Sequence, residues 1–394
     1  MLPEVRMSRI EDAIGLHRGK KLSGAEAADF LGCSERHFLR LRIAYGEGGA
    51  AEVIDRRRGR ASGRRAEVEE IEFVVGEYRE RYFDFRPKHF HEEIAGKPMS
   101  DGKPFCRGYT WTKSVLHRRG LVRKGRLRGP HRKKRERRPL PGMLLFQDGS
   151  QHQWLADGPP LDLIVTMDDA TSWILSIFLV EEEGTASSFR GLAETIGAHG
   201  LFACFYTDRG SHYFSTPKAG EKVDRVRLTQ VGRALEELHI EHIPSYSPQA
   251  RGRIERLWDT LQNRLPQLLR LNGLGTIETA NRWLADVYLA QHNARFGVKP
   301  VEEGSAFLPF AGDLDDILCV REERVVQNDN TVRYGGLVLQ IPESRHRRHF
   351  VRQRVRVHAY PDGSLAIFHG PRKLARYCAD GTVSEDENTT KSAA

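Results

Sequence analysis

The order of apolar patterns after residue 143 limits the possible folds more than any other feature of the sequence. Three apolar runs, beginning at Leu144, Leu161 and Trp173, predict three successive strands. Helical spacing then alternates with single strands: a helix over 189–196, a strand over 201–206, a helix over 228–238, a strand over 242–246 and a helix from 254. Three adjacent strands followed by this alternation predict an α/β core, with a mixed sheet flanked by helices.

Two helical regions are predicted before this core. Ser23 and Ser34 are placed to cap two consecutive helices, and Gly32 lies in the short turn between them. This is the helix-turn-helix pattern, in which the second helix contacts DNA; a plain helical hairpin is the alternative. The candidate DNA contacts on the second helix are Arg36, His37, Arg40 and Arg42. Residues 67–122 predict a second DNA-binding unit of winged or helix-turn-helix type.

Short strand patterns return after the core, from about Val320. Turns such as Gly335-Gly336 and Pro361-Asp362-Gly363 separate them. Several short strands joined by such turns predict a small β-barrel. The polar segment 382–394 is expected to be a disordered tail.

Positive charge is concentrated in two segments between these units. Residues 118–138 hold twelve Lys or Arg and one acid, whereas the whole chain has a net charge of +9. Clustered cations release counterions from a phosphate backbone, so both segments predict contact with DNA, although a solvated linker is the alternative. The candidate contacts are Arg56, Arg57, Arg58, Arg132, Lys133, Lys134 and Arg135.

These patterns divide the chain into seven parts. They are a helix-turn-helix domain (1–55), a basic linker (56–66), a second helical domain (67–122), a basic linker (123–140), the α/β core (141–312), a β-barrel (313–381) and a tail (382–394). No apolar run reaches the ~20 residues that span a bilayer, and the five cysteines form no CxxC pair. The sequence therefore predicts a cytoplasmic protein without membrane contacts, structural zinc or disulfides.

Three acids stand where the predicted sheet would bring them together. Asp148 follows the first strand, Asp208 follows the fourth, and Glu255 begins a helix. Carboxylates that meet at one sheet edge suit Mg²⁺, and two ions ~3.5–4 Å apart can assist phosphoryl transfer. The alternative is that each acid has a structural role, in a turn or beside the N-terminal end of a helix dipole. Four other acids of the core are expected to form a hairpin turn (Asp168, Asp169) and loops (Asp157, Asp162).

The segments around these acids resemble the three acidic motifs of DDE transposases with a retroviral-integrase-like (rve) core, in particular the ISNCY-type transposases of bacterial insertion sequences. The segments are 148–150, 206–211 and 247–256, and the last is the most specific, with Ser-Pro-Gln before Ile-Glu-Arg. The resemblance implies an RNase H-like core with strand order 3-2-1-4-5. It also implies that Asp148, Asp208 and Glu255 are the catalytic triad and bind two Mg²⁺ ions, with Mn²⁺ as a substitute.

The resemblance further implies partners and a reaction. A water cleaves double-stranded DNA at the element ends, and the freed 3′-OH attacks target DNA. Arg256, beside the triad, is a candidate DNA contact. Self-association to at least a dimer and a place at the bacterial nucleoid are expected.

One departure from compact integrase cores is the 46 residues between Asp208 and Glu255, which predict a loop inserted over 214–227. Pro266 predicts a kink or an end in the helix that contains Glu255. Two other functions stay open: a sequence-specific DNA-binding regulator with a non-catalytic RNase H-like scaffold, and a nuclease that cleaves RNA–DNA hybrids.

Overall fold

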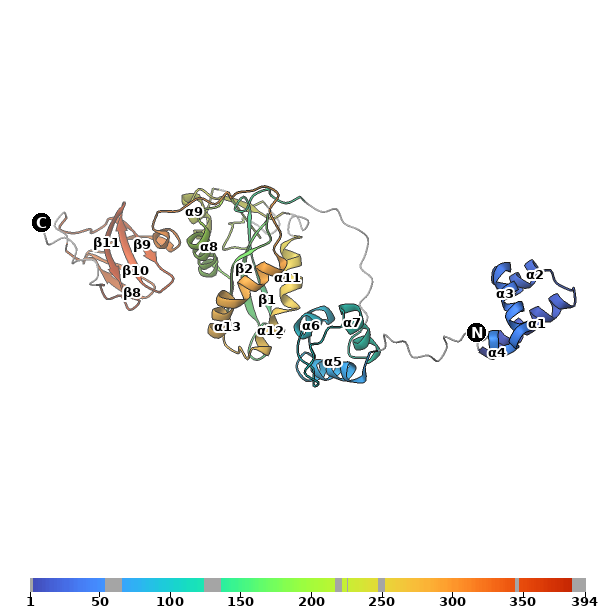
Figure 1. The fold of residues 1–394 in the computed structure, drawn as a ribbon. Coiled ribbons are helices and arrows are strands. Elements are labelled where there is room, and N and C mark those ends of the chain that lie inside the picture. Colours follow the sequence, from blue (N-terminus) through green and yellow to red (C-terminus); the bar gives the residue numbers. More distant parts are fainter. Residues whose placement is uncertain are drawn as a thin grey trace. The chain divides into compact units, whose positions relative to one another are not determined.

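The computed structural model describes residues 3–53, 66–123, 136–216, 222–224, 226–246, 252–343 and 347–384. Two compact units make up the chain, residues 1–72 and 73–394, and each is treated by itself (Figure 1). Most of the predicted basic contacts, Arg56–Arg58 and Arg132–Arg135, lie outside the described residues. Within them, no helix has both the length and the apolar character needed to cross a membrane, and all five cysteines are free.

The first unit begins with a small helical bundle. Its helices are α1 (Pro3–Arg18), α2 (Gly24–Leu31), α3 (Glu35–Gly48) and α4 (Ala50–Val53). The predicted caps are present: Ser23 forms a capping box with Glu26, and the Ser34 side chain accepts the amide of His37. Gly32, with φ +66°, makes the turn between α2 and α3. The unpredicted α1 contributes Ile10, Ala13 and Ile14 to the core of this bundle.

The second helical region consists of α5 (Val68–Glu80), α6 (Pro87–Ile94) and α7 (Tyr109–Arg118). Pro87 stands in the first turn of α6, where its missing N–H costs nothing. Phe90, Phe105 and Leu116 are buried between the elements of this region.

The core is built on one five-stranded sheet. Its strands are β1 (Leu145–His152), β2 (Leu161–Asp168), β3 (Ile174–Val180), β4 (Cys204–Thr207) and β5 (Glu241–Pro244). They lie in the order β3-β2-β1-β4-β5, which confirms the predicted 3-2-1-4-5 order. β1, β2 and β3 pair antiparallel, while β4 is parallel to β1 and to β5.

Helices cover both faces of this sheet. One apolar cluster joins Leu145 to α8 (Thr185–His199) and α9 (Gln230–Glu237). The other joins Phe146 to the remaining core helices: α11 (Ile254–Gln262), α12 (Leu265–Leu271), α13 (Ile277–Trp283), η1 (Leu284–Tyr288) and α14 (Leu289–Phe296). Adjacent β1 residues thus face opposite clusters, as strand geometry requires. Pro266 stands in the first turn of α12, so the prediction of a helix end near it is confirmed.

The C-terminal region is β-rich, as predicted. It contains β6 (Val320–Val325), β7 (Thr331–Tyr334), β8 (Leu337–Gln340), β9 (Arg354–Ala359), β10 (Leu365–His369) and β11 (Arg372–Tyr377). The sheet β11-β10-β9-β6 and the hairpin β7–β8 share one apolar core. Hydrogen bonds between the described strands leave the sheet open, so a closed barrel stays a prediction. Residues 382–384, which were assigned to the tail, are among the described residues, and Val383 pairs with Tyr377.

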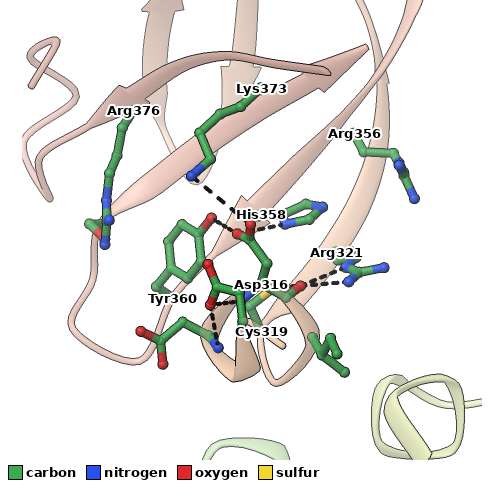
Figure 2. A network of polar contacts seen from close by, with 12 residues as sticks. Asp316, Cys319, Arg321, Arg356, His358, Tyr360, Lys373 and Arg376 are labelled. Carbon is green, nitrogen blue, oxygen red and sulfur yellow. Dashed lines mark hydrogen bonds and ion pairs between the residues drawn. The ribbon is translucent and has the colours of Figure 1, made fainter. Parts of the chain in front are cut away.

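A polar network joins this sheet to the core (Figure 2). The carboxylate of Asp316, in the short helix α15 (Leu314–Ile317), accepts the Tyr360 hydroxyl and lies 3.8 Å from Nδ1 of His358. The Asp316 backbone carbonyl accepts two guanidinium bonds from Arg321, which also pairs with Glu237 of α9 at 2.5 Å. Arg321 therefore ties the C-terminal sheet to a core helix.

The half-buried His242 makes the stability of the core dependent on pH. It stacks on Phe214 at 4.0 Å between ring centroids, and its Nε2 lies 3.0 Å from Oγ1 of Thr207. Burial lowers the pKa of His242 to about 3, below the ordinary value of ~6.5. The neutral ring therefore contributes stability fully above pH ~6.5, and this contribution falls as the pH drops towards 3.

We expect His242→Asn to flatten the acid side of the stability profile. Between pH 6 and 4.5 the wild-type free energy of unfolding should fall more steeply than that of the variant, by about 1.4 kcal/mol per pH unit. Urea titrations followed by tryptophan fluorescence at several pH values measure both slopes. Equal slopes would show that His242 does not control this loss.

Candidate active site

Two of the three predicted acids lie within or directly after paired strands of the sheet. The β1–β4 register pairs Leu145 with Phe205 and Phe146 with Tyr206. Asp148 and Asp208 each lie two residues after the last of these pairs, and neighbouring strands lie about 4.8 Å apart, so we expect the two acids to be close together. Asp148 is 8% exposed, and Asp208, directly after β4, is half-buried. The sequence suggested that Asp148 follows the first strand, but the structure places it inside β1.

The third acid, Glu255, is exposed in the first turn of α11. Two hydrogen bonds hold this helix along β1: Trp258 Nε1 donates to Oδ2 of Asp148 at 2.9 Å, and Gln262 Nε2 donates to Oγ of Ser150 at 3.0 Å. Residues three apart on a helix share a face, so Glu255 lies one turn before the Trp258–Asp148 contact. The fold thus places Glu255 on the helix that contacts Asp148.

Across the described ranges, no three His, Cys, Asp or Glu side chains are close enough together to hold a metal ion. Convergence of Asp148, Asp208 and Glu255 on one ion therefore stays a prediction. The donor chemistry of these residues suits Mg²⁺, because all three offer carboxylate oxygens.

Asp169 anchors the start of α11, a role that the sequence did not reveal. It is fully buried and forms an ion pair with Arg253, which is 9% exposed and lies two residues before Glu255. The other Asp169 carboxylate oxygen accepts the backbone N–H of Arg138 at 2.8 Å. Asp169 is thus more than a turn residue, whereas Asp168 does accept the turn amide of Thr171, as predicted.

A further acid, Glu183, lies beside the site. Its carboxylate packs on Gly149, where an added Cβ would come within 2.2 Å of Oε2. His212 Nε2 stands 3.6 Å from Oε1 of Glu183. Burial, together with the negative charge of Glu183, raises the pKa of the neighbouring Tyr213. The only sequence signal for Glu183 was its place between a strand and a helix. Asp162 is a β2 residue that accepts the Glu183 amide at 2.8 Å, not the loop residue that was expected.

The second helical region contacts the core next to α11. Glu92 of α6 pairs with Arg264 at 2.7 Å and with Arg295. Asp84 pairs with Arg270 of α12 at 2.7 Å. This predicted DNA-binding region therefore rests on the helices that follow Glu255.

The predicted DNA contacts of α3 differ in their surroundings. Arg36, His37 and Arg40 are exposed. Arg42 is half-buried, and its guanidinium lies 3.1 Å from Nε2 of His17. Arg256 is exposed beside Glu255.

Two curated proteins show the family of this chain. A Sinorhizobium fredii protein named transposase y4bF is 33% identical over 355 residues, which cover 88% of this chain and 75% of that protein. The transposase for insertion sequence IS1202 of Streptococcus pneumoniae is 31% identical over 201 residues, covering 51% of this chain and 43% of that protein. No protein-family model matches.

Solved structures with a similar arrangement include two viral proteins. The HTLV-2 integrase catalytic core domain, in complex with magnesium, is 16% identical, with a TM-score of 0.29 over 38% of this chain and 88% of that domain. A chain of the simian T-cell lymphotropic virus intasome is also 16% identical, with a TM-score of 0.33 over 71% and 92% of the two chains. These scores are low, so the assignment rests on the curated relatives.

The order of the five strands and the helices on both faces define an α/β core built on a mixed sheet. The curated relatives show that the chain belongs to the transposases of insertion sequences.

Proposed function

We propose that this transposase uses Asp148, Asp208 and Glu255 to bind two Mg²⁺ ions (Mn²⁺ as a substitute) and to cleave and join DNA. The proposal is supported by the parallel pairing of β1, which contains Asp148, with β4, which directly precedes Asp208, and by the hydrogen bond that holds α11 against Asp148. Bound there, the ions would lower the pKa of the attacking water or 3′-OH and stabilise the leaving oxygen.

Each acid has a distinct part in this proposal. Asp148 and Asp208 provide two oxygen ligands from the rigid sheet, and Glu255 provides a third from the exposed first turn of α11. Without a cation the three carboxylates repel one another, so we expect them to come together only when the ions are bound. Arg256, exposed beside Glu255, would contact a DNA phosphate.

The remaining regions would bind the DNA on which the enzyme acts. The exposed Arg36, His37 and Arg40 of α3 suit contact with the element ends. Arg42, the fourth candidate, is half-buried beside His17. The C-terminal β-region, as a closed barrel or an open sheet, would bind DNA or a second protomer. Because two ends must be paired, we propose at least a dimer in the synaptic complex.

The direct test is a cleavage assay with duplexes that contain the inverted repeats flanking the open reading frame. The proposal predicts Mg²⁺-dependent nicking at the repeat ends and joining of the freed 3′ ends to target DNA. A DNA-binding regulator with a non-catalytic scaffold would bind the repeats without cutting them. A nuclease for RNA–DNA hybrids would cut hybrids in preference to the repeats.

We expect the basic linker to bind DNA without regard to sequence. Replacing Arg132, Lys133, Lys134 and Arg135 with Gln removes four cations. If each contacts a phosphate, the slope of log K against log salt should flatten by about 3.6, and affinity should fall for every duplex. Fluorescence anisotropy with repeat and scrambled duplexes at several salt concentrations measures both effects. A loss confined to the repeat duplex would contradict this role.

A further inference from the structure

Trp258 makes a contact that core packing alone does not require. Its indole N–H points at a carboxylate, Oδ2 of Asp148, at 2.9 Å. An indole nitrogen can only donate, and a bond to an ionised oxygen is stronger than one to a neutral acceptor. The acceptor is one of the proposed metal ligands, and the donor lies three residues after another, Glu255.

The surroundings of Trp258 hold its ring in place. The side chain is half-buried against the apolar cluster under α11. Its ring packs beside that of Trp154, with the centroids 6.4 Å apart. One turn later, Gln262 donates a hydrogen bond to Ser150. Asp148 and Ser150 are two residues apart and share a face of the strand, so α11 contacts β1 at two neighbouring positions of that face. A donor fixed in this way restricts rotation of the Asp148 carboxylate.

We propose that Trp258 is a positioning residue of the active site. Its indole N–H orients the Asp148 carboxylate. Because Trp258 and Glu255 both belong to α11, this contact also sets the distance over which Glu255 must reach the same ions. This inference rests on the proposed function, since it assumes that Asp148 binds metal. Loss of a partner that orients a metal ligand typically costs 10–100-fold in metal affinity or activity.

The test compares Trp258→Phe with Trp154→Phe. Trp258→Phe removes the donor to Asp148 and keeps an aromatic ring. The control removes the neighbouring indole, whose N–H donates to the backbone oxygen of Ser150 at 2.9 Å and not to a carboxylate. Mn²⁺ affinity is measured by electron paramagnetic resonance without DNA, and the Mg²⁺ concentration for half-maximal cleavage is measured with repeat duplexes.

We expect Trp258→Phe to weaken Mn²⁺ binding and to raise the half-maximal Mg²⁺ concentration by about 10–100-fold, while Trp154→Phe changes both by less than about threefold. Circular dichroism shows whether each variant is folded. If Trp258→Phe does not fold, a benzothienylalanine at position 258 keeps the ring shape, lacks the N–H, and should give the same metal defect. Wild-type metal affinity in a folded variant without the N–H would overturn the inference.

Asp148→Asn separates this inference from the proposed function. If Asp148→Asn loses Mn²⁺ binding and a variant without the indole N–H does not, only the role of Trp258 fails. If Asp148→Asn binds Mn²⁺ and cleaves like the wild type, the proposed site itself fails, and the role of Trp258 fails with it.

Discussion

Asp208→Asn is expected to reduce Mg²⁺-dependent cleavage and strand transfer by at least about 10³-fold. The substitution keeps the size of the side chain and removes the negative charge that would hold the ions. Stabilisation of the transition state by a metal ion amounts to several kcal/mol, and each 1.4 kcal/mol corresponds to about tenfold in rate. Gel assays with labelled repeat duplexes measure both reactions.

Binding of the element ends provides the control for this variant. Asp208 lies after β4 in the core, whereas the proposed end contacts lie on α3, so the affinity for repeat duplexes should stay within about threefold of the wild type. Asp157→Asn, which changes an exposed acid in the loop after β1, should leave both activities intact. Cleavage by Asp208→Asn at more than a tenth of the wild-type rate in Mg²⁺ would refute the assignment of Asp208.

Asp169→Ala is expected to lower the free energy of unfolding of the core by about 3–5 kcal/mol. The substitution leaves the guanidinium of Arg253, only 9% exposed, without its carboxylate partner. It also removes the acceptor of the Arg138 amide. Urea denaturation followed by tryptophan fluorescence measures the loss.

An exposed ion pair offers the matched control for Asp169→Ala. Glu278 pairs with Arg282 one turn later on α13, and the two side chains are 82% and 68% exposed. Glu278→Gln should therefore cost less than about 0.5 kcal/mol. Equal losses in the two variants would show that the buried pair does not stabilise the start of α11.

The strands of the sheet could be predicted because they have clear local patterns, whereas their order was implied by the family resemblance. The mostly apolar run Leu161–Met167 belongs to β2, a strand that is buried on both faces. The end of β1 was missed for the opposite reason. Its last residues, Gly149 to His152, are polar or small and half-exposed, so only their pairing with β2 shows that the strand continues through Asp148.

The contacts of the site could not be predicted because their partners lie far apart in the chain. Asp169 and Arg253 are 84 residues apart, and Trp258 and Asp148 are 110 residues apart. Helical spacing in the sequence does not show which group the indole nitrogen of Trp258 meets. The motif around Glu255 identified the acid without showing how its helix is held.

The most direct measurement for the central claim is anomalous diffraction from crystals of the protein soaked in Mn²⁺. We expect anomalous peaks within about 2.2 Å of carboxylate oxygens of Asp148, Asp208 and Glu255, with two peaks ~3.5–4 Å apart when DNA is bound. A Mn²⁺ ion bound away from these three side chains, or no peak beside Asp148 and Asp208 at saturating Mn²⁺, would contradict the claim that they form one metal site.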